Sequence, residues 1–296
     1  MGQEMGTSAP GDTRGKVGVV ASSAGVLREV VCLLSRQGVA VVRAIRPGGE
    51  PGVQAADGFL GGLQALQNDP EIKVVVAIVA GTRDVDEEQV LEHVAQSHHP
   101  AVLCLLGGDT SRAWQAGAIP ARRLDEAAHR AAAWVRGWDQ ALISAQLEEQ
   151  DEELATMAAK LRRLLGAGRR GIVGLFASQE LCREAWLMLG DVAGEGVTLD
   201  CVNLSPQSLS DALDDPGAGV ILLDLVVEGD TPEVLSEEVA VALEMLQGPG
   251  PLVIAHVCGL DLDSVERAEA RLSQAGVTIV GSNAAAARLA GMVVSV

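Results

Sequence analysis

Two patterns of apolar and polar residues take turns along this chain. One is a short, continuous apolar run, such as Val74 to Val79, which is typical of a strand buried on both faces of a parallel sheet. The other places apolar residues at helical spacing, as in Val26 to Gln37, which stops at Gly38. This alternation predicts open, mostly parallel sheets with helices on both faces.

The same alternation occurs in both halves of the chain. In the first half, the predicted strands are Val17–Ala21, Val39–Ile45, Val74–Val79 and Ala101–Leu106, and the helices are Val26–Gln37, Phe59–Gln67 and Val85–Ser97. In the second half, the predicted strands are Ile172–Ala177, Leu199–Leu204, Val220–Val226, Leu252–Val257 and Val277–Val280. The helices there are Leu181–Leu189, Leu209–Leu213, Pro232–Leu246, Val265–Ala275 and Ala284–Leu289.

Three segments of the first half recur in the same order in the second. KVGVVASSAGVLREVVCLL matches GIVGLFASQELCREAWLML, and both carry an Arg-Glu pair in the helical part. ALQNDPEIKVVVAIVAG matches ALDDPGAGVILLDLVVEG, and HPAVLCLLGG matches GPLVIAHVCG. This order indicates a duplicated domain, and a site formed by such a pair is expected between the copies.

The duplication sets the predicted domain organisation. We expect a disordered N-terminus over residues 1–14, one α/β domain over 15–123, a helical connector over 124–168 and a second α/β domain over 169–296. Leu124 to Leu165 reads as a long amphipathic helical tract. It either packs along its own domain or forms a subunit contact, and the sequence leaves both open.

Composition excludes several classes of function. A net charge of −18, from 22 basic and 40 acidic residues, argues against nucleic-acid binding. No apolar run is long enough to span a membrane, and the N-terminus does not resemble a secretory signal. The five cysteines show no CxxC spacing, and Cys32, Cys104 and Cys182 lie within apolar patterns. We therefore expect buried free thiols in a reducing cytoplasm, and the coding bias suggests a bacterium.

Each half has a strand that ends in Ala-Ser and leads into a helix. Backbone N–H groups at such a helix start bind anions, and a glycine lets an anion approach the backbone. The candidate anion-binding residues are therefore Ser22, Ser23, Ala24, Gly25, Ser178 and Gln179. The alternative is that Ser22 and Ser178 only cap their helices, and Glu180 disfavours a highly charged anion beside the second start.

Other candidates lie at predicted carboxyl ends of strands, where ligands bind in open α/β sheets. His256 and Cys258 point the same way from one strand and are the catalytic candidates, although a buried structural role is the equal alternative. Neither this pair nor any other group of side chains gives a convincing metal site. Further substrate-binding candidates are Gly48, Gly49, Gly107, Gly108, Asp224, Ser282 and Asn283, of which Ser282-Asn283 reads most simply as a helix cap.

The repeated segments resemble a known family. GKVGVVASSAGVLREVVCLLSRQG, FLGGLQALQNDPEIKVVVAIVAG and HPAVLCLLGG are similar to the ligase domain of the succinyl-CoA synthetase α subunit, and the second repeat is similar to that of the β subunit. Their fusion, with AHVCG and GSNAAAARLAG in the second half, resembles the FdrA family over about residues 15–292. The resemblance implies two tandem flavodoxin-like domains.

Departures from the synthetase limit the implied chemistry. Gln115 stands where the synthetase α subunit has its phosphorylated histidine, and a carboxamide is not nucleophilic at phosphorus. We also expect no N-terminal CoA-binding domain, since only a short segment precedes the first strand. ATP-dependent CoA ligation by this chain alone is therefore excluded, and no cofactor, CoA included, is expected.

FdrA proteins are implicated in an oxamate carbamoyltransferase that acts with other subunits in allantoin catabolism. The resemblance thus implies a subunit that handles an acyl phosphate such as carbamoyl phosphate, with partner subunits or copies of itself. The alternative is a non-catalytic scaffold or regulatory subunit. The absence of a clear general base near the helix starts favours that alternative.

Overall fold

The computed structural model describes residues 17–47, 54–56, 58–81, 85–166, 168–194, 197–227, 233–245 and 250–295. The strands are β1 (Val17–Ala21), β2 (Val41–Pro47), β3 (Gln54–Ala56), β4 (Val74–Val79), β5 (Ala101–Leu105), β6 (Ile119–Ala121), β7 (Gly171–Phe176), β8 (Leu199–Asn203), β9 (Ala218–Val227), β10 (Leu252–Gly259) and β11 (Thr278–Ile279). The α-helices are α1 (Ala24–Arg36), α2 (Gly58–Gln67), α3 (Glu87–Ala95), α4 (Thr110–Gln115), α5 (Leu124–Arg136), α6 (Gln140–Leu161), α7 (Gln179–Val192), α8 (Pro206–Asp214), α9 (Glu233–Glu244), α10 (Leu262–Gln274) and α11 (Asn283–Val294). A 3-10 turn, η1 (Arg162–Leu164), follows α6.

The strands form two parallel sheets. The first has the order β3-β2-β1-β4-β5-β6, and the second has the order β8-β7-β9-β10-β11. Without its edge strand β3, the first sheet repeats the order of the second, which is the flavodoxin-like order 2-1-3-4-5. The predicted fold class, two tandem flavodoxin-like domains with parallel sheets, is confirmed.

The central strands form because their residues are apolar on both faces. All residues of β4 are buried, and so are all but one of the ten residues of β9. Helices must therefore cover both faces of each sheet. On the outer faces, α2 and α3 pack on the first sheet and α8 and α10 on the second, and each outer layer has its own apolar cluster.

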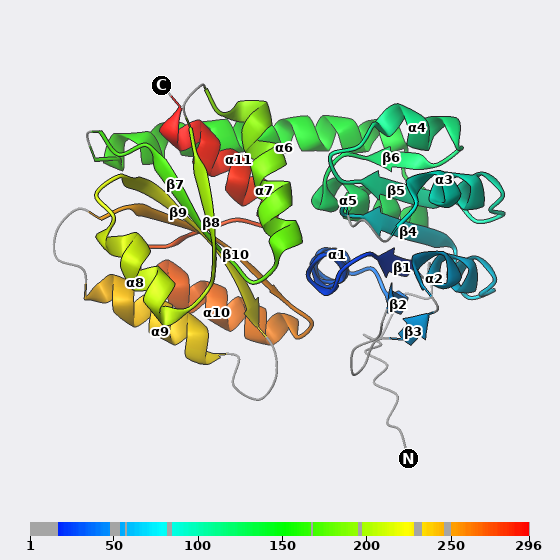
Figure 1. The fold of residues 1–296 in the computed structure, drawn as a ribbon, viewed down its shortest axis with the longest axis horizontal. Coiled ribbons are helices and arrows are strands. Elements are labelled where there is room, and N and C mark those ends of the chain that lie inside the picture. The colour runs from blue at the N-terminus through cyan, green and yellow to red at the C-terminus, as the bar shows by residue number, and fades with distance from the viewer. Residues whose placement is uncertain are drawn as a thin grey trace, which may run out of the picture.

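The inner faces of the two sheets are joined by a single apolar core. Its buried residues include Val26 and Val30 of α1, Ala128 of α5, Leu181 of α7 and Ala287 of α11. Figure 1 shows α1 and α7 between the two sheets, and the two helices contact each other. The domains are therefore packed together through the helices that open each repeat.

The predicted connector, residues 124–168, has two roles. Its first part, α5, packs on α1 and on the strands of the first sheet. Gly137 then ends α5 in a left-handed conformation (φ 70°), and α6 runs beside both domains and packs on α11 (Figure 1). The tract therefore consists mainly of two helices, α5 and α6, and both pack on other elements of the same chain.

The sequence missed three short elements, β3, α4 and β6, because a few residues give too little periodicity to detect. The expectation for the thiols was also partly wrong. Cys182 on α7 and Cys201 on β8 form a disulfide, whereas Cys32, Cys104 and Cys258 are free and buried. Cys182 was expected to be free because its neighbours are apolar, but β8 is an edge strand and brings Cys201 beside it.

Candidate functional site

The starts of α1 and α7 lie against each other. A Cβ atom added to Gly25, in the first turn of α1, would overlap with Oγ of Ser178, the N-cap of α7. Both helices begin after the first strand of their domain, so the contact lies at the carboxyl ends of β1 and β7. The two predicted anion-binding starts are therefore adjacent, and Gly25 accommodates the neighbouring helix.

The serines at these starts bond to the protein itself. Ser23 caps α1, because its Oγ accepts a hydrogen bond from the N–H of Val26 (3.4 Å). Ser22 does not cap the helix; its Oγ accepts from the N–H of Ala80, at the end of β4 (3.0 Å). Ser178 occupies the N-cap position of α7 without a capping bond from its side chain. Ala24 and Gln179 are the first residues of the two helices.

Two carboxyl groups lie at the start of α7. The Ser178 hydroxyl donates to Glu180 (2.7 Å), and the N–H of Ala177 donates to Asp224, within β9 (3.3 Å). Burial raises the pKa of Asp224 to about 6, although the charge of His256 opposes the rise. One carboxylate oxygen of Asp224 is buried without a hydrogen bond. The start of α7 is therefore much less favourable to an anion than the start of α1.

An arginine of α7 reaches over the first domain. The guanidinium of Arg183 lies against Gly81, the second residue after the end of β4. A Cβ atom added to Gly81 would be 2.6 Å from Cζ of Arg183. Gly81 has a φ of 67°, a left-handed conformation that also favours glycine. Among the described residues, no acidic group forms an ion pair with Arg183. This cation therefore lies at the carboxyl edge of the first sheet, where open α/β sheets bind ligands.

His256, the principal catalytic candidate, is held in a buried ion pair. Its Nε2 bonds to the carboxylate of Glu29 on α1 (2.6 Å), and its Nδ1 lies 3.4 Å from the carbonyl of Val280. Burial lowers the pKa of His256, but the charge and hydrogen bond of Glu29 outweigh it and raise the value to about 9. His256 is 1% exposed, so this arrangement joins the domains and leaves no ring nitrogen open to a substrate.

Glu184 stands on α7 at the position that Glu29 has on α1, counted from the N-cap serines. It accepts hydrogen bonds from the N–H of Leu124 (2.8 Å), the first residue of α5, and from the Asn283 side chain (2.8 Å). Glu29 correspondingly accepts from the N–H of Asn283, the first residue of α11 (3.4 Å). The first helix of each copy therefore places a glutamate at the N-terminus of the last helix of the other copy.

The predicted cap at Ser282 is confirmed. Its hydroxyl accepts from the N–H of Ala285 (3.0 Å) and donates to Asp125 of the first domain (2.9 Å). Burial raises the pKa of Glu184 to about 8, and the charge of Asp125 adds to the rise. Ser282 and Asn283 thus serve the contact between domains.

The remaining candidates are dispersed. Cys258 is buried beside Cys32 of α1, on the same face of β10 as His256. Gly107 faces the Leu187 side chain, and Gly108 turns back onto Leu105. Gly48 and Gly49 lie outside the described residues.

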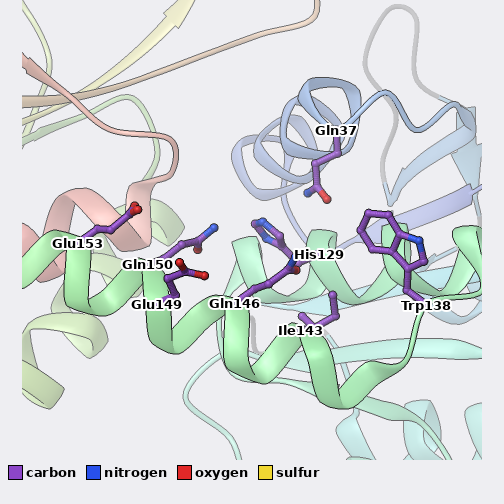
Figure 2. Close-up of a pocket in the computed structure, with 8 residues that line it drawn as sticks. All are labelled: Gln37, His129, Trp138, Ile143, Gln146, Glu149, Gln150 and Glu153. Atoms are coloured by element: carbon purple, nitrogen blue, oxygen red, sulfur yellow. The ribbon is translucent and has the colours of Figure 1, made fainter.

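A separate pocket of about 420 Å³ opens at the other end of α1 (Figure 2). The side chains that line it are Gln37, His129, Trp138, Ile143, Gln146, Glu149, Gln150 and Glu153. Trp138 also stacks under the guanidinium of Arg136, 4.8 Å from the ring centroid. None of the candidates from the sequence lies in this pocket, and the length of α1, roughly 20 Å, separates it from the helix starts.

Comparison with known proteins bears on the second domain. Residues 176–293 match the CoA-ligase family. This match agrees with the resemblance of the second repeat to a succinyl-CoA synthetase ligase domain. No curated protein matches the chain.

The solved structures that the chain matches are distant. PH0766 from Pyrococcus horikoshii OT3 is 13% identical, with a TM-score of 0.35 over 95% of this chain and 64% of its own. The apo dinucleotide-forming acetyl-coenzyme A synthetase 1 of Ca. Korarchaeum cryptofilum is 11% identical, with a TM-score of 0.34 over the same shares. The C-terminal domain of glucosamine-fructose-6-phosphate aminotransferase from Francisella tularensis is 12% identical, with a TM-score of 0.34 over 95% of this chain and 82% of its own. The chain thus spans less than two thirds of the first two proteins.

Among the described residues, no helix combines the length and apolar character that crossing a membrane requires.

Proposed function

We propose that this chain is an FdrA-like subunit of an acyl- or carbamoyl-transferring enzyme. In the oxamate carbamoyltransferase reaction, the oxamate nitrogen bonds to the carbamoyl carbon of carbamoyl phosphate while the carbon–oxygen bond to phosphate breaks. Inorganic phosphate leaves and the N–H proton is released. Such a subunit has to hold a phosphate or carboxylate group in place.

The contact between the two helix starts carries this proposal. Gly25 and Ser178 bring the N-termini of α1 and α7 together at the carboxyl edges of both sheets. Helix N-termini favour anions, and Arg183 adds a positive charge over the end of β4. Because Glu180 and Asp224 occupy the α7 side, the anion is expected nearer α1 and Arg183.

The tryptophans support a role within a larger assembly. All four are on the surface, with exposed fractions of 71% at Trp114, 43% at Trp134, 49% at Trp138 and 63% at Trp186. Tryptophan is enriched at protein interfaces and dominates their binding energy. The chain has few aromatic residues, yet it exposes the largest of them to solvent. This surface is suited to binding partner subunits or further copies of the chain.

Thermal unfolding of the whole chain with inorganic phosphate and with carbamoyl phosphate tests the anion site. We expect each to raise Tm by a few degrees beyond sodium chloride of the same ionic strength. Arg183→Gln should reduce this protection, whereas Arg163→Gln, a matched change on exposed η1, should not. Glu180→Gln should increase it, because the competing carboxylate is removed. Equal protection by phosphate and chloride would reject the site.

The second candidate function is a non-catalytic scaffold or regulatory subunit. It is favoured by His256, whose two ring nitrogens both face protein groups. Purified chain should be assayed for carbamoyl-phosphate phosphorolysis, alone and with the products of neighbouring genes. Phosphorolysis that requires this chain supports the transferase, and phosphorolysis by the partners without it supports the scaffold.

A further inference from the structure

The pocket at the C-terminal end of α1 contains none of the residues that the anion site uses. It lies between the end of α1, helix α5 and the first half of α6 (Figure 2). The lining residues of α6 follow one stripe from Ile143 to Glu153, which extends about 15 Å along the helix. Its volume of about 420 Å³ is in the range of small-molecule sites. The pocket is therefore an elongated groove that accommodates a linear organic molecule.

Two side chains of this groove are held by hydrogen bonds that leave an acceptor atom for a ligand. The Nδ1 of His129 lies 2.8 Å from the carbonyl of Asp125, so in the neutral ring Nδ1 carries the proton and Nε2 is an acceptor. The side-chain amide nitrogen of Gln37 donates to the carbonyl of Leu33 (3.3 Å), which leaves its Oε1 as an acceptor. Both side chains line the groove, so they offer acceptors to a ligand that donates hydrogen bonds.

Negative charge lies along the α6 side of the groove. Glu149 and Glu153 are exposed and lie one helical turn apart, about 6 Å along the axis. In the part of the chain that the structure describes, neither carboxylate forms an ion pair. None of the described residues that line the groove is a lysine or an arginine. The groove therefore favours a ligand with positive charge, which the net charge of −18 also attracts.

The protein already holds one cation at the rim of the groove. The guanidinium of Arg136 lies over the Trp138 ring, 4.8 Å from its centroid, and donates to the carbonyl of Gln37. An aromatic ring and the C-terminus of a helix both attract positive charge. Figure 2 shows Glu149 and Glu153 at the other end of the groove from Trp138. The two carboxylates are thus left for a cation from outside the chain.

We propose that this groove binds a linear aliphatic polyamine, in which ammonium groups are separated by short methylene chains. The ammonium groups pair with Glu149 and Glu153 and donate to Nε2 of His129. The methylene chains pack on Ile143, which is 1% exposed and forms an apolar wall. A metal ion does not fit, because the described residues include no group of three or more His, Cys, Asp or Glu side chains that could hold one.

The proposed polyamine site is independent of the anion site and of the proposed transferase function. Gln37 and His129 belong to the first α/β domain, whereas α6 also packs on α11 of the second. A polyamine in the groove therefore bridges α6 to the end of α1, and it does so without contact to either helix start.

Isothermal titration calorimetry of the full-length chain with spermidine tests the proposal. The titration is made at constant ionic strength, set with sodium chloride. We expect one saturable site per chain. The diol 1,8-octanediol, a neutral molecule of similar length, should give no binding heat, and magnesium chloride at the same ionic strength should leave the affinity for spermidine unchanged.

Two double variants of α6 separate the groove from the general negative charge of the protein. Glu149→Gln with Glu153→Gln removes both carboxylates of the groove, whereas Glu148→Gln with Glu152→Gln removes two that do not line it. All four residues are exposed, and both variants change the net charge equally. The first variant should raise the Kd for spermidine about tenfold, and the second by less than about twofold.

Far-UV circular dichroism of both double variants should match that of the parent, because exposed side chains are changed. Equal weakening by the two variants would overturn the proposal, since spermidine would then respond only to overall charge. Absence of a saturable binding heat in the parent chain, or displacement of spermidine by magnesium chloride, would also reject it.

Discussion

Glu29→Gln and Glu184→Gln change the same position of two equivalent helices, yet their effects at pH 7 should have opposite signs. Glu29 pairs with His256, whereas Glu184 is buried with neutral donors and a nearby acid. Because the substitution is the same in both variants, a difference between their stabilities reports the surroundings of each carboxyl group.

Glu29→Gln breaks a buried ion pair. The pKa of His256 is about 9 in the folded protein and 6.5 in the reference state. Because the folded value is raised, the stabilisation is complete below pH 6.5 and is lost as the pH rises through 9. The shift corresponds to about 3 kcal/mol, in line with the cost of breaking a buried pair. The variant should be less stable than the parent by about that amount at pH 6 to 7, and the difference should shrink toward pH 9.

Glu184→Gln removes a carboxyl group whose pKa is raised from 4.5 to about 8. For this group, the folded protein loses stability as the pH rises from 4.5 to 8, by up to about 1.4 kcal/mol per unit. Glutamine escapes that loss but gives up part of one hydrogen bond to Asn283, about 1 kcal/mol. The variant should therefore be more stable than the parent at pH 7, and the difference should be larger at pH 8.

Urea unfolding followed by far-UV circular dichroism at pH 6, 7, 8 and 9 measures both effects. Circular dichroism is preferred because the tryptophans are exposed and report the core poorly. The slope m should match that of the parent. Equal destabilisation by both variants at pH 7, or a deficit at Glu29→Gln that does not change with pH, would refute this reasoning.

Three further changes have defined outcomes. Gly25→Ala should lower Tm through a clash with the N-cap of α7, at a cost of about 1–3 kcal/mol, whereas Gly190→Ala on open α7 surface should raise stability by up to about 1 kcal/mol. Cys201→Ser should cost about 3 kcal/mol, and the deficit should disappear when the disulfide to Cys182 is reduced in the parent. Trp186→Ala should change the stability of the isolated chain by less than about 0.5 kcal/mol but weaken co-purification with partner subunits.

Periodicity alone predicted most of the fold. β4 was predicted with its observed bounds, because a strand buried on both faces has no polar residue to blur its ends. The start of α1 was less well defined, since Ser22 and Ser23 are both suitable caps and the bond from Ser22 to Ala80 depends on strand pairing. Very short elements such as β6 lack a detectable period.

The partners of the site residues could not be predicted, because they come from the other domain. His256 was visible as a polar interruption of an apolar strand, but nothing local indicates that Glu29 meets it. One signal was available. Both repeats place a glutamate, Glu29 and Glu184, on the apolar face of a helix. A carboxyl group on a buried helix face requires a donor, and its repetition in both copies points to the contact between them.

The two copies have kept their strand order but not their chemistry. The positions that face the interface are Ile78 and Cys104 in the first domain and Asp224 and His256 in the second. Ionisable groups have thus gathered on one side of a symmetric contact, where burial makes each of them costly unless paired. The residues of the first domain show that this contact can be packed without ionic groups. Packing alone therefore does not explain the charged residues of the second domain. The charged half, with the His256 ion pair and the neighbouring thiols, is therefore where function should be sought first if the anion site fails its test.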